Sequence, residues 1–163
     1  MDGKVIQRGD RFAVRFERIL PHTMAKVWAA LTTPAELEKW FAVTIVELRV
    51  GGRFHVRFED GSTVDGEVRA VEPPRLLEVT WHEKGHDPSV LRWELFPHDD
   101  GTRFVLTHTL SAKDWSTGFL GGWHDHLDLL GAALAGTPID RDSGRWQALE
   151  DEYRGLVPEI AAE

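Results

Sequence analysis

Cysteine is absent from the sequence of 163 residues, and tyrosine occurs only once. Without cysteine the chain can form neither a disulfide nor a thiolate metal site, and catalysis by a thiol is excluded. No apolar stretch approaches the roughly 18 residues of a membrane-spanning helix. The first four residues do not begin a basic and then apolar signal segment either. We therefore expect a cytoplasmic protein that does not contact a membrane.

Positive charge is also scarce. The chain carries 19 Lys and Arg residues against 27 Asp and Glu residues, which gives a formal net charge of -8. Non-specific binding to nucleic acid or to an anionic membrane surface depends on clustered Lys and Arg side chains. The sequence shows no such cluster, so we expect no nucleic acid among the partners.

Large apolar side chains, by contrast, are plentiful. Seven Trp and eight Phe residues stand in a chain that is 42% hydrophobic, and such side chains suit a core or a lined pocket. The length is that of one ordinary domain with a single core. We expect this domain over residues 1–136, with residues 137–163 as a C-terminal extension that is helical and packs on the same domain.

The first part of the chain predicts a strand and two short helices. Residues 11–20 alternate apolar and charged side chains, as a half-buried strand does. The first helix should span 23–32, with Thr23 as its N-cap. The second should begin at Thr33-Pro34, because proline is favoured at the first helical position.

The middle of the chain predicts a meander of strands. From about residue 44 to residue 110, short strand-like runs are separated by tight turn signals such as Gly51-Gly52 and Asp60-Gly61. Consecutive strands joined by short loops should be antiparallel neighbours. Counting the first strand, we expect about seven strands in one curved sheet. The alternation within each run leaves one face of this sheet apolar.

A long helix should cover that apolar face. Residues 119–135 carry an apolar stripe at helical spacing, which ends before Gly136. One helix in a strongly bent sheet leaves space beside it, so the expected fold is α+β with a cavity between sheet and helix. Beyond this helix, the spacing of Trp146, Leu149, Tyr153 and Leu156 predicts a further amphipathic helix. The apolar stripe of the long helix at residues 119–135 consists of Trp123, Leu127, Leu130 and Leu134.

A series of motifs follows a fixed order along the chain. They are Phe16-Glu17-Arg18-Ile19-Leu20-Pro21, Val27-Trp28-Ala29-Ala30-Leu31-Thr32, Pro34-Ala35-Glu36-Leu37, Trp40-Phe41, Arg49-Val50-Gly51-Gly52-Arg53-Phe54, Pro73-Pro74-Arg75-Leu76-Leu77 with Thr80-Trp81, and Gly122-Trp123 with Leu127. In these motifs the chain resembles the START-related SRPBCC superfamily. Within it, the most similar branch is the one named after the activator of heat-shock protein 90 ATPase. The resemblance runs from about residue 11 to residue 135.

This resemblance implies the helix-grip fold, with two short helices after the first strand, six further strands and a long final helix. It also implies a ligand cavity. Members of the superfamily bind lipids or hormones, act as cyclases or aromatase-like enzymes on polyketides, or contact the chaperone. Residues 137–163 extend past the resemblance, which therefore implies nothing about them.

The strand alternation and the helical stripe together assign side chains to the walls of the expected cavity. We expect Trp40 and Phe41 near its entrance, and further walls from the sheet and the final helix. The expected lining residues are Trp40, Phe41, Phe54, Val56, Phe58, Val79, Trp81, Trp93, Leu95, Leu106, His108, Trp123, Leu127 and Leu130.

His108 is the histidine that strand phase places on the cavity side. It could fix a polar group of a ligand or move a proton, although a core histidine satisfied by a neighbouring Thr or carbonyl is the interpretation we favour. His124 and His126 differ by about 200° around a helix and cannot share a metal ion, so we expect solvated or capping roles for them. His82 and His86 flank a loop and should be exposed. No metal site and no cofactor is predicted.

Three functions follow as hypotheses. The first is non-catalytic binding of a small hydrophobic or aromatic molecule between the sheet and the final helix. The second is a stress-related, co-chaperone-like interaction module that uses its outer surface, with a chaperone or a second copy as partner. The third is a polyketide cyclase-like enzyme with His108 as acid or base. The sequence offers no aligned nucleophile, base and oxyanion donor for any other catalytic arrangement.

Overall fold

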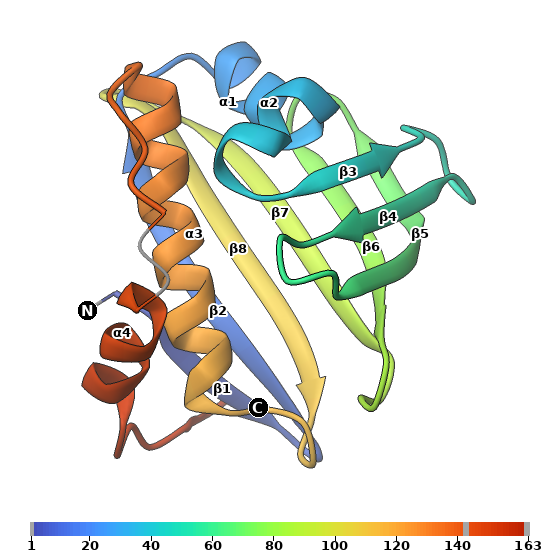
Figure 1. Ribbon diagram of the computed structural model, residues 1–163, viewed down its shortest axis with the longest axis vertical. Coiled ribbons are helices and arrows are strands. Elements are labelled where there is room, and N and C mark those ends of the chain that lie inside the picture. Colours follow the sequence, from blue (N-terminus) through green and yellow to red (C-terminus); the bar gives the residue numbers. More distant parts are fainter. Residues whose placement is uncertain (1, 142–143, 162–163) are drawn as a thin grey trace.

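The computed structural model describes residues 2–141 and 144–161. Within these residues the chain forms one nine-stranded sheet and four helices (Figure 1). The strands are β1 (Lys4–Arg8), β2 (Arg11–Leu20), β3 (Val43–Val46), β4 (Arg53–Arg57), β5 (Thr63–Glu72), β6 (Leu76–Glu83), β7 (Ser89–His98), β8 (Gly101–Ser111) and β9 (Glu159–Ile160). The helices are α1 (Met24–Thr32), α2 (Pro34–Trp40), α3 (Thr117–Ala135) and α4 (Arg145–Tyr153).

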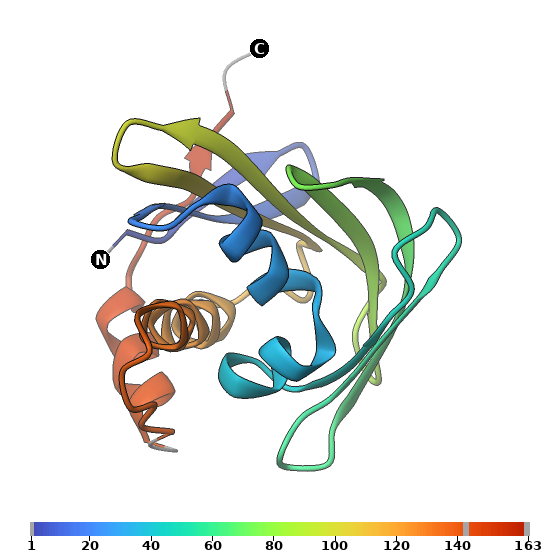
Figure 2. The ribbon, with the colours of Figure 1, turned by 90° about the horizontal axis from the view of Figure 1, so that it is seen from above.

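The sheet is curved and partly encloses the helices. Its strand order is β3-β4-β5-β6-β7-β8-β2-β1-β9, so the meander from β3 to β8 runs across it in chain order, as short loops require. Seen from above, the strands bend around α1 and α2, and α3 lies along the open side (Figure 2). This is the α+β, helix-grip arrangement that the sequence predicts. None of the described helices is long and apolar enough to cross a membrane.

Two strands exceed the predicted seven. β1 forms a hairpin with β2 through Gly9, which adopts φ +62°, and β9 pairs in parallel with β1. The sheet is therefore not purely antiparallel, which corrects the prediction. A five-residue strand with one fully buried side chain and a two-residue strand carry too little alternation to be recognised in sequence.

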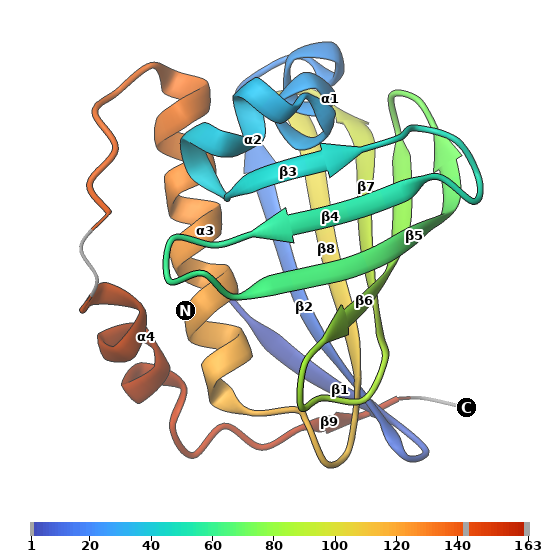
Figure 3. The ribbon, with the colours of Figure 1, turned by 45° about the vertical axis from the view of Figure 1, so that its right-hand side comes forward.

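The predicted helix boundaries are confirmed where local chemistry fixes them. Thr23 caps α1, its hydroxyl accepting from Lys26 N at 3.2 Å, and α2 starts at Pro34. α3 ends at Gly136, whose φ of +70° lets its N–H reach the carbonyls of the last turn. α1 and α2 cover one end of the space between α3 and β3 (Figures 1 and 3).

α4 packs on α3 at a very close helix crossing. A Cβ built on Gly121 would lie 2.7 Å from both Glu150 N and Trp146 O, which is closer than real Cβ atoms come to backbone. Only glycine permits this approach. Leu149 and Tyr153 are the buried residues of α4. The extension is thus held against the face of α3 that turns away from the β3–β5 hairpins (Figure 3).

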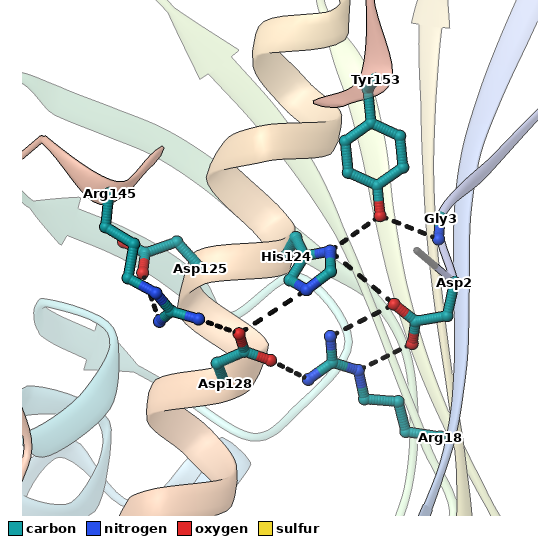
Figure 4. A network of polar contacts seen from close by, with 8 residues as sticks. All are labelled: Asp2, Gly3, Arg18, His124, Asp125, Asp128, Arg145 and Tyr153. Carbon is teal, nitrogen blue, oxygen red and sulfur yellow. Dashed lines mark hydrogen bonds and ion pairs between the residues drawn. The ribbon is translucent and has the colours of Figure 1, made fainter. Parts of the chain in front are cut away.

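Asp128 of α3 connects β2 with α4 (Figure 4). Arg18 donates to Asp128 Oδ1 at 2.7 Å and to Asp2 at 2.9 Å. Arg145 donates to the other oxygen of Asp128 and, at 3.0 Å, to Asp125. Burial alone would raise the pKa of Asp128, but hydrogen bonds from Arg18 and Arg145 hold this pKa below its ordinary value.

Tyr153 closes the other half of this network (Figure 4). Its hydroxyl accepts from Gly3 N at 3.0 Å and lies 2.7 Å from Nδ1 of His124, whose Nε2 is 3.6 Å from Asp128. Only 14% of the His124 side chain is exposed, and burial lowers its pKa. The solvated or capping role predicted for His124 is therefore wrong, because α4 and the N-terminal segment together cover this face of α3.

Candidate functional site

An open cleft of about 430 Å³ lies between the N-terminal half of α3, the end of β6 and the turn after β4. Phe41, the residue that follows α2, also borders it. Six aromatic side chains and four polar ones border it together with two glycines. The lining residues are Phe41, Phe58, Trp81, Glu83, His86, Ser116, Gly118, Phe119, Gly122, Trp123, His126 and Trp146.

The inner wall of the cleft is a continuous group of aromatic rings. Phe41 stacks on Trp123, with ring centroids 5.6 Å apart and planes 25° from parallel. Phe58 meets Phe41 edge to face at 5.5 Å, and Trp81 lies 5.8 Å from Trp123. Such rings offer flat apolar surface whose geometry is fixed by its own packing.

Glycines of α3 create the space in front of this wall. Gly118, Gly122 and His126 follow one another at intervals of four, so they lie on one face of the helix. A Cβ built on Gly122 would meet no atom within 4 Å. Glycine inside a helix costs about 1 kcal/mol relative to alanine, and no close neighbour requires it at this position. Because Gly122 has no side chain, the space beside it stays open and forms part of the cleft.

Four of the fourteen predicted lining residues border the cleft: Phe41, Phe58, Trp81 and Trp123. The others lie in the core behind it. Trp40 is fully buried, its indole N–H donating to Ala30 O at 2.8 Å, so it does not stand at an entrance as predicted. α2 turns its ring inward onto α1. The residues that do not line the cleft are Trp40, Phe54, Val56, Val79, Trp93, Leu95, Leu106, His108, Leu127 and Leu130.

His108 lies directly behind Trp81, with ring centroids 5.2 Å apart. The indole N–H of Trp123 donates to its Nδ1 at 3.0 Å, so this nitrogen carries no proton. The proton of the neutral ring is therefore on Nε2, which lies 2.8 Å from the hydroxyl of Ser89 and donates to it. Ser89 in turn donates to the carbonyl of Trp81 at 3.3 Å.

This arrangement fixes what His108 can do. Burial lowers its pKa to about 3, so the ring is neutral near pH 7. Both nitrogens are engaged, and Ser89 receives a hydrogen bond from the ring instead of giving up its proton to it, which is the reverse of an activated nucleophile. Any transfer of a proton through His108 would require the bond to Trp123 or to Ser89 to break.

His126 also differs from its prediction. It is half-buried at the cleft wall, edge-on to Phe41 with centroids 5.1 Å apart. Its Nδ1 lies 3.4 Å from the carbonyl oxygen of Trp40, and burial lowers its pKa to about 4. The solvated or capping role predicted for it is wrong, because the loop after α2 and the turn after β4 enclose the ring. His82 and His86 are exposed, as predicted.

Other residues of the cleft were missed by sequence reasoning. The spacing of Gly118, Gly122 and His126 was a usable signal, since glycines one turn apart inside a helix need a reason. Phe119 lies beside them, next to His108 at 5.2 Å. Trp146 comes from α4, whose position no local pattern indicates. Within the described residues, no three His, Asp or Glu side chains converge to hold a metal ion.

The comparisons with known proteins agree with this architecture. The family model described as "Activator of Hsp90 ATPase homolog 1-like protein" matches residues 21–135, well over half of the chain. A comparison with curated proteins found no match.

Solved structures share the fold. Protein MLL2253 from Mesorhizobium loti is 30% identical, with a TM-score of 0.70 over 78% of this chain and 99% of that chain. CalU16 from Micromonospora echinospora reaches a TM-score of 0.79 over 95% of this chain and 96% of that one, but at 24% identity this likeness shows the fold alone. DynU16, a putative protein in the dynemicin biosynthetic locus, is 26% identical, with a TM-score of 0.70 over 80% of this chain and 49% of that chain. By its fold and the family match, the chain belongs to the activator of Hsp90 ATPase homolog 1-like family of the SRPBCC superfamily.

Proposed function

We propose that this chain binds a small, flat, hydrophobic molecule in the cleft between α3 and β6. The observation that carries the proposal is the pair of helix glycines facing a wall of stacked aromatic rings. A volume of about 430 Å³ falls within the range of about 300–1,000 Å³ usual for small-molecule sites. The polar groups are few among the lining side chains, which is also usual for such sites.

Filling the cleft should abolish this binding. In Gly122→Phe the new ring would occupy the space over Trp123, and we expect the affinity for N-phenyl-1-naphthylamine, an uncharged probe that fluoresces in apolar sites, to fall at least tenfold. The fold should persist, because nothing lies within 4 Å of the new Cβ and phenylalanine favours a helix more than glycine does. Fluorescence titration measures the loss.

Gly131→Phe is the matched control. Gly131 lies on the same helix, a Cβ there also meets nothing within 4 Å, and it does not border the cleft. This variant should bind the probe like the unchanged protein. A protein that gives no emission with the probe, or equal binding by both variants, would contradict the proposal.

A second candidate function, the protein-interaction module, has one observation in its favour. Among the residues that the structure describes, β3 ends the strand order, so its outer edge is unpaired. Val43, Ile45, Leu48 and Val50, on β3 and the segment after it, are between 40% and 68% exposed. Apolar side chains along a free edge favour pairing with another chain, and a second copy could pair edge to edge about a two-fold axis.

Sedimentation tests this alternative. If β3 forms the contact, the unchanged protein should sediment as a dimer, and Ile45→Lys should convert it to a monomer, because a charged side chain on an edge strand blocks pairing. Thr63→Lys, on β5 and away from that edge, is the control. A monomer at all concentrations counts against an interaction through this edge.

A further inference from the structure

His126 gives the cleft a hydrogen-bond acceptor in a surrounding of aromatic rings. The carbonyl of Trp40 can only accept, so Nδ1 of His126, 3.4 Å away, must carry the proton of the neutral ring. The other nitrogen, Nε2, then presents a lone pair. Burial lowers the pKa of His126 to about 4, so this neutral form persists near pH 7.

Nε2 of His126 has no hydrogen-bond partner among the described residues. The fully buried side-chain atoms that lack a partner in these residues do not include it. Nε2 therefore keeps some exposure, and His126 is one of the residues that border the cleft. Around it are the ring of Phe41, at 5.1 Å between centroids, and that of Phe58, at 6.2 Å. An acceptor surrounded by apolar rings discriminates strongly between ligands with and without a hydrogen-bond donor. A ligand that cannot donate to the acceptor leaves it desolvated and unpaired.

The charges at the cleft also restrict the ligand. Glu83 borders the cleft, and its carboxylate accepts from the indole N–H of Trp81 at 3.4 Å. Arg141, whose charge lowers the pKa of His126, pairs with Glu59 at 3.5 Å and does not border this cleft. A carboxylate-bearing ligand would therefore meet the negative charge of Glu83 and would offer only acceptors to Nε2, which is itself an acceptor. Both effects disfavour an anion.

We infer that the ligand of this cleft is an uncharged aromatic molecule that carries a hydrogen-bond donor, such as a phenolic hydroxyl, and that Nε2 of His126 accepts from it. The inference rests on the proposed function. Gly122 lies one helical turn from His126 on the same face. A ring lying over Gly122 therefore brings a hydroxyl at its edge towards Nε2.

Two probes of nearly equal size test the donor. 2-Naphthol carries a hydroxyl where 2-methylnaphthalene carries a methyl group, and calorimetric titration gives the dissociation constant of each. We expect the naphthol to bind about tenfold more tightly, the ratio that one net hydrogen bond supplies. In His126→Phe, which keeps an aromatic ring but loses the acceptor, the preference for the naphthol should disappear. His126→Leu serves the same purpose if the phenylalanine variant does not fold.

The outcomes separate this inference from the proposed function. Equal binding of both probes by the unchanged protein would overturn the inference and leave the proposed function standing. A preference for the naphthol that survives both His126 variants would place the acceptor elsewhere and overturn it as well. Binding of neither probe would remove the proposed function and the inference with it.

Discussion

Gly121→Ala is expected to loosen α4 from the domain, whereas the same change one residue later, Gly122→Ala, should leave α4 in place and make the protein more stable. At Gly121 the new methyl group would lie 2.7 Å from backbone atoms of Trp146 and Glu150. Backbone cannot yield as a flexible side chain can, so the two helices must separate. We expect a net loss of about 1–3 kcal/mol of unfolding free energy, the usual cost of overpacking.

At Gly122 the methyl group meets no atom within 4 Å. The gain in helix propensity then acts alone, and the unfolding free energy should rise by about 0.5–1 kcal/mol. Urea unfolding measures both changes, and limited proteolysis followed by mass spectrometry shows whether residues 144–161 are released. Equal protection of α4 in both variants would mean that the helices do not cross at Gly121 as described.

The second large expected effect is a loss of stability at acidic pH. Because burial lowers the folded-state pKa of His108 to about 3, the unfolded chain binds a proton at this residue between about pH 6.5 and pH 3 and the folded chain does not. His108 therefore leaves the unfolding free energy unchanged above about pH 6.5 and lowers it progressively as the pH falls below that value. Between pH 6.5 and pH 5 it should remove about 2 kcal/mol of unfolding free energy, at about 1.4 kcal/mol per pH unit.

His108→Gln isolates this effect. The variant should be less stable at pH 7.5, since a flexible amide replaces the ring that packs against Trp81 and Phe119 and accepts from Trp123. Its unfolding free energy should nevertheless fall by about 2 kcal/mol less than that of the unchanged protein between pH 6.5 and pH 5. His82→Gln, at an exposed position on β6, is the control and should keep the original pH profile. An unchanged slope in His108→Gln would show that His108 is not held neutral.

The fold could be predicted from sequence because its signals are local. The alternation in β2, the proline at the start of α2 and the glycine after α3 each act within a few residues. β9 could not be predicted, since two residues carry no period and their partner, β1, lies at the other end of the described chain. Its presence depends on where α4 docks, which the close approach at Gly121 decides.

The candidate site was predictable only in part. The sequence indicates which strand face is apolar, from which Phe58 and Trp81 follow, and which stripe of the long helix is apolar, from which Trp123 follows. It does not indicate where aromatic rings pack on each other and where they border open volume. That difference depends on side chains such as Trp40, which turns towards Ala30, and on Trp146, which reaches the cleft from α4. Whether each predicted wall residue contacts a ligand stays a prediction.

The pairing of β9 with β1 has a consequence for synthesis on the ribosome. β1 and β2 emerge early and can form their hairpin at once, but the outer edge of β1 finds Glu159–Ile160 only after nearly all the intervening chain has been made. At about 5–20 residues per second this delay is on the order of 10 s. During that interval the nascent hairpin presents an open template to neighbouring polypeptides. A variant that weakens the docking of α4 should therefore lower the soluble yield in cells more than its equilibrium stability indicates.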